Sequence, residues 1–152
     1  EGSDVTVNTL TSDGAITATA GGVTATAGGV TATAGDLVAT TDTLKLDNGG
    51  SVTQSSSKSD TVVLPHPVGK ITMHAAALAA DAIVTFTVTC SHARATDVCI
   101  VNHHSGGTVG AYSIDATGHA AGSFKITVTN VSAGSLSEAL VLHCALIKTA
   151  HT

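Results

Sequence analysis

A seven-residue repeat near the start of the chain constrains its fold more than any other feature. From Gly14 the sequence reads GAITATA, GGVTATA, GGVTATA, GDLVATT and DTLKLDN, so the repeats cover residues 14–48. Each unit has one large aliphatic residue at the same phase: Ile16, Val23, Val30, Leu37 and Leu44. Within a unit, valine and alanine alternate with threonine, and Gly-Gly pairs separate units. This pattern is typical of a short strand and a turn, not of a helix.

Strand-and-turn repeats of this kind build a β-solenoid or a β-prism shared by several chains. If one coil needs about three such strands, the repeats make fewer than two coils, which is too few to bury a core of their own. We therefore expect residues 1–50 to form a repetitive β shaft or anchor in a homotrimer, with Val23, Val30 and Leu37 on its shared interior. The alternative is a flexible linker, although a linker has no need to keep a strict aliphatic phase.

The composition changes after Asn48 and the polar run 54–60, which we take as a domain boundary. Beyond it, strand-like segments recur every 10–15 residues, with turn signals such as Ser105-Gly106-Gly107 between them. The predicted strands are Thr61–Leu64, Lys70–His74, Ile83–Cys90, Asp97–Asn102, Val109–Ala116, Ser123–Asn130 and Ala139–Ile147. Clear alternation of apolar and polar residues in several of them predicts an antiparallel, jelly-roll-like β-sandwich over residues 51–152.

The last predicted strand, Ala139–Ile147, differs from the others because both of its faces are apolar. One face carries Leu140, Leu142, Cys144 and Leu146, and the other carries Val141, Ala145 and Ile147. A strand of this kind lies in the centre of a sandwich or in a subunit interface. We therefore predict that the second face belongs to the interface of the homotrimer.

The overall composition excludes several classes of function. Charged residues make up 11% of the chain, and 6 basic against 11 acidic residues give a net charge of −5, which disfavours a nucleic-acid partner. No apolar run approaches the roughly 18 residues of a membrane-spanning helix, so we expect no membrane partner. Aromatic residues make up only 2%, so the core must be aliphatic.

Candidate metal ligands are numerous but do not form a motif. There are eight histidines, and the adjacent His103 and His104 would point to opposite faces of a strand. One histidine per chain on a three-fold axis could supply three nitrogen ligands without any motif, and this alternative stays open. We expect hydrogen-bonded or exposed histidines, and no metal and no other cofactor.

Candidate catalytic groups are equally scattered. Ser105 lies beside His104, but no Gly-x-Ser-x-Gly elbow is present, and Ser-Gly-Gly is typical of a turn. Three cysteines make an odd number, which argues against a disulfide framework. We expect Cys90 and Cys144 to be buried and Cys99 to be less protected. Asp81, Asp97, Asp115 and Glu138 fall at different loop and strand ends. We therefore predict no catalytic residues and no enzymatic activity.

The stretch from about Gly50 to Lys148 resembles a domain found at the ends of structural proteins of tailed bacteriophages, especially marine phages. The segments that carry the resemblance are SVTQSSSKSDTVVL, GKITMHAAALAADAIVTFTVT and VNHHSGGTVGAYSIDATGHAAGSFKITVTNVSAGSLSEALVLHCALIK. The preceding GGVTATAGGVTATAGDLVATTDTL is similar to the repetitive shafts of phage fibre and spike proteins. The resemblance implies a non-enzymatic, trimeric protein of the virion, on the capsid surface or the tail, and it brings no set of functional residues.

These observations lead to two functional expectations. The first is a structural protein that decorates or stabilises the capsid or projects from it as a trimeric fibre, with the phage major capsid protein or tail and baseplate proteins as partners. The alternative is a receptor-binding tail-fibre knob that recognises host glycans. Glycan sites use exposed aromatic rings, and only Tyr112 is free for this role if Phe86 and Phe124 face inward.

Overall fold

The computed structural model describes residues 49–149, which all belong to one compact unit of the chain. Within this range the protein is all-β, and it has no helix that could cross a membrane. The strands are β1 (Gly50–Thr53), β2 (Val62–Val63), β3 (Val68–Thr72), β4 (Ile83–Thr89), β5 (Val98–Ser105), β6 (Tyr112–Ala120), β7 (Ser123–Asn130) and β8 (Val141–Ile147). The predicted shaft, apart from its last two residues, lies outside the described residues and stays a prediction.

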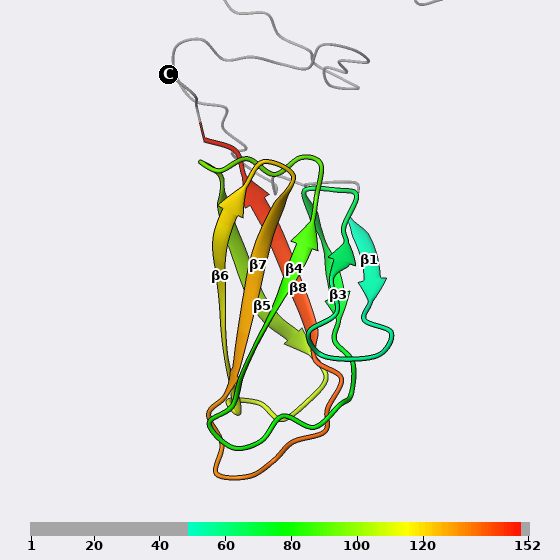
Figure 1. Ribbon diagram of the computed structural model, residues 1–152, viewed down its shortest axis with the longest axis vertical. Helices are drawn as coiled ribbons and strands as arrows, with labels where there is room; N and C mark the ends of the chain where they lie inside the picture. Colours follow the sequence, from blue (N-terminus) through cyan, green and yellow to red (C-terminus); the bar gives the residue numbers. More distant parts are fainter. Residues whose placement is uncertain (1–48, 150–152) are drawn as a thin grey trace, which may run out of the picture. The chain divides into compact units, whose positions relative to one another are not determined.

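The strands form two open four-stranded sheets that face each other (Figure 1). Sheet A has the order β1-β3-β8-β5, and sheet B has the order β2-β4-β7-β6. The predicted all-β sandwich is thus confirmed in outline. The expectation of a purely antiparallel structure is wrong, because β1 pairs with β3 and β2 pairs with β4 in parallel. In each parallel pair, the chain crosses to the other sheet before it returns in the same direction.

Chain connections explain why neighbouring strands in sequence are not neighbours in space. Of the seven connections between the eight strands, six pass from one sheet to the other. Among the described residues, only β6 and β7 form a hairpin within one sheet, with Ala120 opposite Ser123. Strand pairing therefore depends mostly on contacts between distant parts of the chain.

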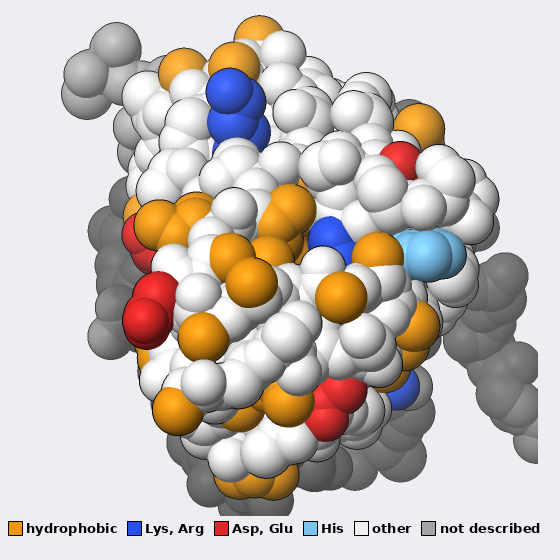
Figure 2. Space-filling model, turned by 60° about the horizontal axis from the view of Figure 1, so that its bottom comes forward, with side chains coloured by type: hydrophobic (Ala, Val, Ile, Leu, Met, Phe, Trp, Pro, Cys, Tyr) orange, Lys and Arg blue, Asp and Glu red, His pale blue; other side chains and the backbone are white. Residues whose placement is uncertain are grey.

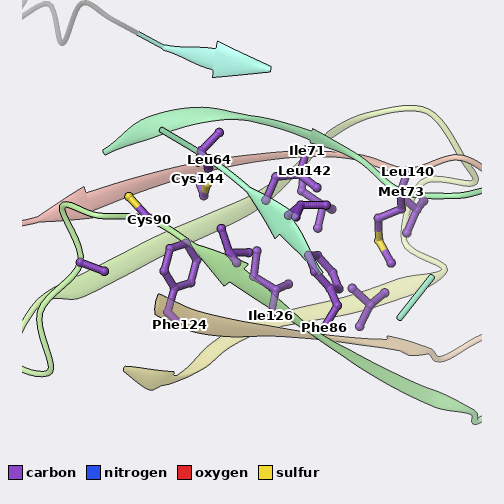
Figure 3. Close-up of a cluster of buried hydrophobic side chains, with 14 of the residues drawn as sticks. Leu64, Ile71, Met73, Phe86, Cys90, Phe124, Ile126, Leu140, Leu142 and Cys144 are labelled. Atoms are coloured by element: carbon purple, nitrogen blue, oxygen red, sulfur yellow. The ribbon is translucent and has the colours of Figure 1, made fainter. Parts of the chain in front are cut away.

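A hydrophobic core fills the space between the two sheets (Figure 3). Sheet B contributes both phenylalanines, Phe86 and Phe124, which are 2% and 1% exposed and face inward as predicted. Sheet A contributes mainly the inward face of β8. Apart from Asn130, the other large, fully buried side chains are aliphatic or sulfur-containing: Leu64, Ile71, Met73, Ile126, Leu140, Leu142, Val88, Val128 and Cys90. The expectation of an aliphatic core is confirmed.

Strand β8 is the central strand that its two apolar faces predicted. It pairs with β3 on one side and with β5 on the other. Its side chains Leu142, Cys144 and Leu146 point into the core, and the preceding Leu140 is also buried. Its second face therefore forms the middle of the outer surface of sheet A.

Several strand bounds differ from those expected. β1 was not predicted, because Gly50–Thr53 is short and adjoins a polar run that signals a boundary. β5 continues to Ser105, beyond the predicted end at Asn102. β6 begins at Tyr112 instead of Val109, because the N–H and hydroxyl groups of Thr108 donate hydrogen bonds to the Glu138 carboxylate and hold this segment in a loop.

Candidate functional site

The outer surface of sheet A carries a continuous group of aliphatic side chains, which we call the aliphatic strip: Val98, Ile100, Ala145 and Ile147. Strand pairing places Val98 directly opposite Ile147, and Ile100 directly opposite Ala145. Val98, Ile100 and Ile147 are 50%, 48% and 49% exposed. Val68 on β3 lies opposite Ala145 from the other side and extends the strip across three strands. Side chains in such directly opposed positions are in contact, so the strip is one surface and not a set of isolated residues.

A polar row lies beside the strip on the same face. His143 in the middle of β8 lies opposite Lys70 on β3 and opposite Asn102 on β5. Lys70, Asn102 and His143 are all exposed. His104, also exposed, packs its ring against His143 with a centroid separation of 5.3 Å. Sheet A thus presents an aliphatic half next to a polar, histidine-containing half.

The outer surface of sheet B has a different character, because hydroxyl groups cover its middle. Thr85 and Thr127 lie opposite each other, and their hydroxyl oxygens are 2.9 Å apart. The exposed aliphatic residues here, Ile83 and Val63, lie opposite Thr129 and Thr89 at the two ends of β4. They are therefore separated from each other. Of these two outer surfaces, only that of sheet A has adjoining, directly opposed aliphatic side chains.

The predicted interface residues fall into two groups. Val23, Val30 and Leu37 lie outside the described residues. Val141, Ala145 and Ile147 all lie on the outer surface of sheet A, where Ile147 is exposed and the other two are half-buried. Sequence reasoning did not include the β5 half of this surface. The only signal for it was the run Val98 to Val101, which alternates too little to show which side faces out.

A second candidate site lies at the end of the sandwich where the long loops meet. A cavity of about 320 Å³ is lined by residues of β5, β6 and their connection: His103, His104, Ser105, Gly106, Gly107, Val109, Gly110 and Tyr112. Gly106 and Gly107 have φ values of 69° and 70°, and a Cβ at either would lie 2.4 Å from an atom of the segment 139–140. Figure 2, with this end brought forward, shows few and separate charged side chains among uncharged and hydrophobic ones.

Glu138 fixes the wall of this cavity. Its carboxylate accepts hydrogen bonds from the Thr108 N–H at 3.0 Å, the Thr108 hydroxyl at 2.7 Å and the Tyr112 hydroxyl at 2.7 Å. The hydrogen bond from Tyr112, with those from Thr108, holds the pKa of Glu138 below its usual value. Burial and the neighbouring carboxylate raise the pKa of Tyr112, so the phenol stays protonated. Glu138 therefore acts as a structural tie between two loops.

Buried Lys58 ties a third loop to the same region. Its Nζ donates to the backbone carbonyls of His74 at 2.7 Å and Glu138 at 2.6 Å. Only 4% of the residue is exposed. Burial lowers the pKa of Lys58, and the charge of Glu138 partly opposes this shift. Nothing in the sequence marked Lys58 as buried, because it lies in a serine-rich polar run.

Most of the groups that might have formed a catalytic or metal centre are separated from one another, and His104 and His143 are the exception. His103 hydrogen-bonds the carbonyl of Gly106 and packs edge-on against Tyr112, while His104 contacts His143. Asp97 pairs with Lys148, whose hydrogen bond is the main reason that the pKa of Asp97 is lowered. Within residues 49–149, no three His, Cys, Asp or Glu side chains converge in a group that could hold a metal.

The expected order of cysteine burial is confirmed. Cys90 and Cys144 are buried, and Cys99 is half-buried. Cys99 faces the interior, while its neighbours Val98 and Ile100 face out, because β5 is an edge strand whose inward side is only partly covered. Burial raises the pKa of Cys99 to about 12 and that of Cys144 to about 11. These thiols are therefore protonated and unreactive at neutral pH.

Comparison with known proteins adds no relative. No protein-family model, no curated protein and no solved structure matches the chain.

Proposed function

We propose that this chain is a non-enzymatic structural protein of a phage virion, which decorates or stabilises the capsid or projects from it as a trimeric fibre. The observation that carries the proposal is the aliphatic strip on sheet A, where Val98, Ile100 and Ile147 are each about half exposed and adjoin one another. A contiguous aliphatic surface of this kind is typical of contacts between proteins. The proposed location on a phage virion rests on the resemblance of the sequence to phage structural proteins.

The use of polar groups in the sandwich supports a structural role. Hydrogen bonds hold loops in place at three polar residues, Glu138, Asp97 and Lys58. The Asp60 carboxylate likewise accepts bonds from the backbone N–H groups of successive serines, including Ser56 at 2.7 Å and Ser57 at 3.1 Å. Groups held in this way serve rigidity, which a virion component requires.

In this proposal the homotrimer contact lies on the outer surface of sheet A, which carries the predicted interface residues Val141, Ala145 and Ile147. The hydroxyl-covered surface of sheet B remains exposed to water in this arrangement. The assembled trimer then binds the major capsid protein or a tail or baseplate protein, which gives the chain its location on the virion.

Charge placed on the two sheet surfaces tests this arrangement. Ile100→Asp combined with Ile147→Asp puts two carboxylates into the contact, and the matched control is Ile83→Asp combined with Val63→Asp on sheet B. Light scattering should give three times 14.9 kDa for the wild type and the control, and a smaller mass for the sheet A variant. A wild-type monomer, or equal behaviour of the two variants, would refute the arrangement.

A separate pair of variants tests the shaft. Replacing Val23 and Val30 with Asp would bury unpaired charge on the shared interior, at a cost of several kcal/mol per chain. Replacing Thr24 and Thr31 with Asp, one position further along, should be mild, because alternation places them on the wet side. Size-exclusion chromatography and circular dichroism should show loss of the trimer for the valine pair alone. Equal responses would support the linker interpretation.

One observation favours the alternative, a receptor-binding knob that recognises host glycans. Tyr112 lines the 320 Å³ cavity together with His103, His104 and Ser105, and combines an aromatic ring with polar neighbours. Since this is the only tyrosine in the chain, its ring resonances can be followed without ambiguity. Addition of host surface glycans should shift them if the cavity is a glycan site, and unchanged resonances would reject this alternative.

A further inference from the structure

We propose that His104 and His143 form a two-histidine site for a divalent transition-metal ion on the outer surface of sheet A. The two residues are 39 positions apart in sequence, and strand pairing brings them together. The pair forms within one chain, and because His143 lies between Val141 and Ala145, the proposed trimer contact must leave the polar half of this surface uncovered for an ion to enter.

An irregularity in β5 creates this pair. His103 lies opposite Leu142 and Ser105 lies opposite Val141, so the register shifts between them and leaves His104 as an extra residue. A bulge of this kind redirects a side chain that regular pairing would place elsewhere. It brings the His104 ring to 5.3 Å from the His143 ring, with an angle of 70° between the ring planes.

The ring separation matches the requirement of a shared metal ion. With a metal–nitrogen bond of about 2.1 Å, and about 1.2 Å from that nitrogen to its ring centre, two rings at a tetrahedral angle have centres about 5.4 Å apart. The observed centroid distance is 5.3 Å. Binding requires both exposed side chains to rotate until one nitrogen of each ring points at the ion.

Both imidazoles are also free to bind. Neither ring makes a hydrogen bond to any residue in the described range, in contrast to His103, which hydrogen-bonds Gly106, and His74, whose Nδ1 accepts from Ala76. Imidazole nitrogens suit Zn²⁺, Cu²⁺ and Ni²⁺. The Cys144 thiol does not compete, because it is buried in the core between the sheets, on the side of β8 away from His143.

The surroundings define an open and exchangeable site. Asn102 on β5 lies opposite His143 on one side of β8, and Lys70 on β3 lies opposite His143 on the other side. Lys70 disfavours a cation nearby, but its side chain is exposed and can extend away into water. With two protein ligands, water completes the coordination of the ion.

Metal titration of the full chain tests the site, with Cu²⁺ and Zn²⁺ as probes and calorimetry at neutral pH as the measurement. His104→Gln and His143→Gln should each weaken binding at least about tenfold, and the double variant should lose little more, because the two ligands act as one unit. His92→Gln, an exposed histidine outside the pair, is the matched control and should change affinity less than about twofold.

A second readout locates the ion. Substoichiometric Cu²⁺ should broaden the NMR signals of His143 and Asn102 before those of His92, through its unpaired electron. Unchanged affinity in both single variants, an equal loss in His92→Gln, or broadening that begins elsewhere would overturn the proposal. Circular dichroism of each variant confirms that the fold is retained.

Discussion

Asn130, at the end of β7, offers the sharpest test of how the loop end is held together. The residue is 0% exposed. Its amide group donates to the carbonyls of Leu78 at 2.9 Å, Ala79 at 3.1 Å and Gly134 at 2.7 Å. Its Oδ1 accepts from the N–H of Ser132 at 3.0 Å and from the Ser132 hydroxyl at 2.7 Å. One side chain therefore joins two loops to the sheet.

The cost of Asn130→Ala follows from these bonds. Two amide protons and two accepted bonds correspond to about four hydrogen bonds at about 1 kcal/mol each. The Leu78 and Ala79 carbonyls keep backbone donors from Leu136 and Ala82, which lowers the cost. The Ser132 N–H loses its hydrogen-bond acceptor, which raises the cost of the substitution again. We expect a loss of about 3–4 kcal/mol in the free energy of unfolding, a large share of the stability of a small domain.

The matched control is Asn102→Ala, the same substitution at an exposed position of β5 where the side chain makes no hydrogen bond within the described range. It should change the free energy of unfolding by less than about 0.5 kcal/mol. Ser132→Ala removes only one of the bonds to Asn130 and should cost about 1 kcal/mol.

Urea unfolding of the three variants, followed by far-ultraviolet circular dichroism, gives these differences from the midpoint and slope. If Asn130→Ala cost no more than Asn102→Ala, the hydrogen-bond account of the loop end would be refuted. If Asn130→Ala does not fold, the intermediate loss in Ser132→Ala still tests the account, since no loss there would contradict it.

Three further predictions concern groups with shifted pKa values. Cys144 should react with a thiol reagent more slowly than Cys99 in the native protein, and both more slowly than a peptide thiol, and the reverse order would contradict their burial. Because the pKa of Asp97 is lower in the folded protein than its unfolded value of about 3.8, the ionised carboxylate stabilises the fold above that pH, and this contribution is lost as the pH falls through the folded pKa. Asp97→Asn should therefore be less stable than the wild type at pH 7, and the urea midpoints of the two proteins should converge in acid. Glu138→Gln should let the phenol of Tyr112 ionise at lower pH in an ultraviolet titration, because the carboxylate helps to raise its pKa, and coincident titration curves would show that it does not.

Alternation and residue type were sufficient to predict every strand of the sandwich except β1, and the inward faces of β4 and β7. Phe86 and Phe124 lie on strands in which every second residue is apolar, so their burial could be predicted from local pattern alone. The two apolar faces of the last strand left a central strand and a subunit interface as alternatives, and the pairing of β8 with β3 and β5 shows its central place in sheet A. The turn at Ser105-Gly106-Gly107 likewise follows from local backbone preferences.

Only the tertiary structure decided which distant segments meet. The aliphatic strip joins Ile100 to Ala145, and the histidine pair joins His104 to His143, across a strand pairing that no local pattern encodes. Six of the seven connections cross between sheets, so the partner of each strand is set by the packing of the whole core. Buried Lys58 shows the same limit, since its polar neighbours indicate a surface loop until the carbonyls of His74 and Glu138 are brought to it. Side-chain alternation is a local property of the chain, whereas contact between distant residues is a property of the folded molecule.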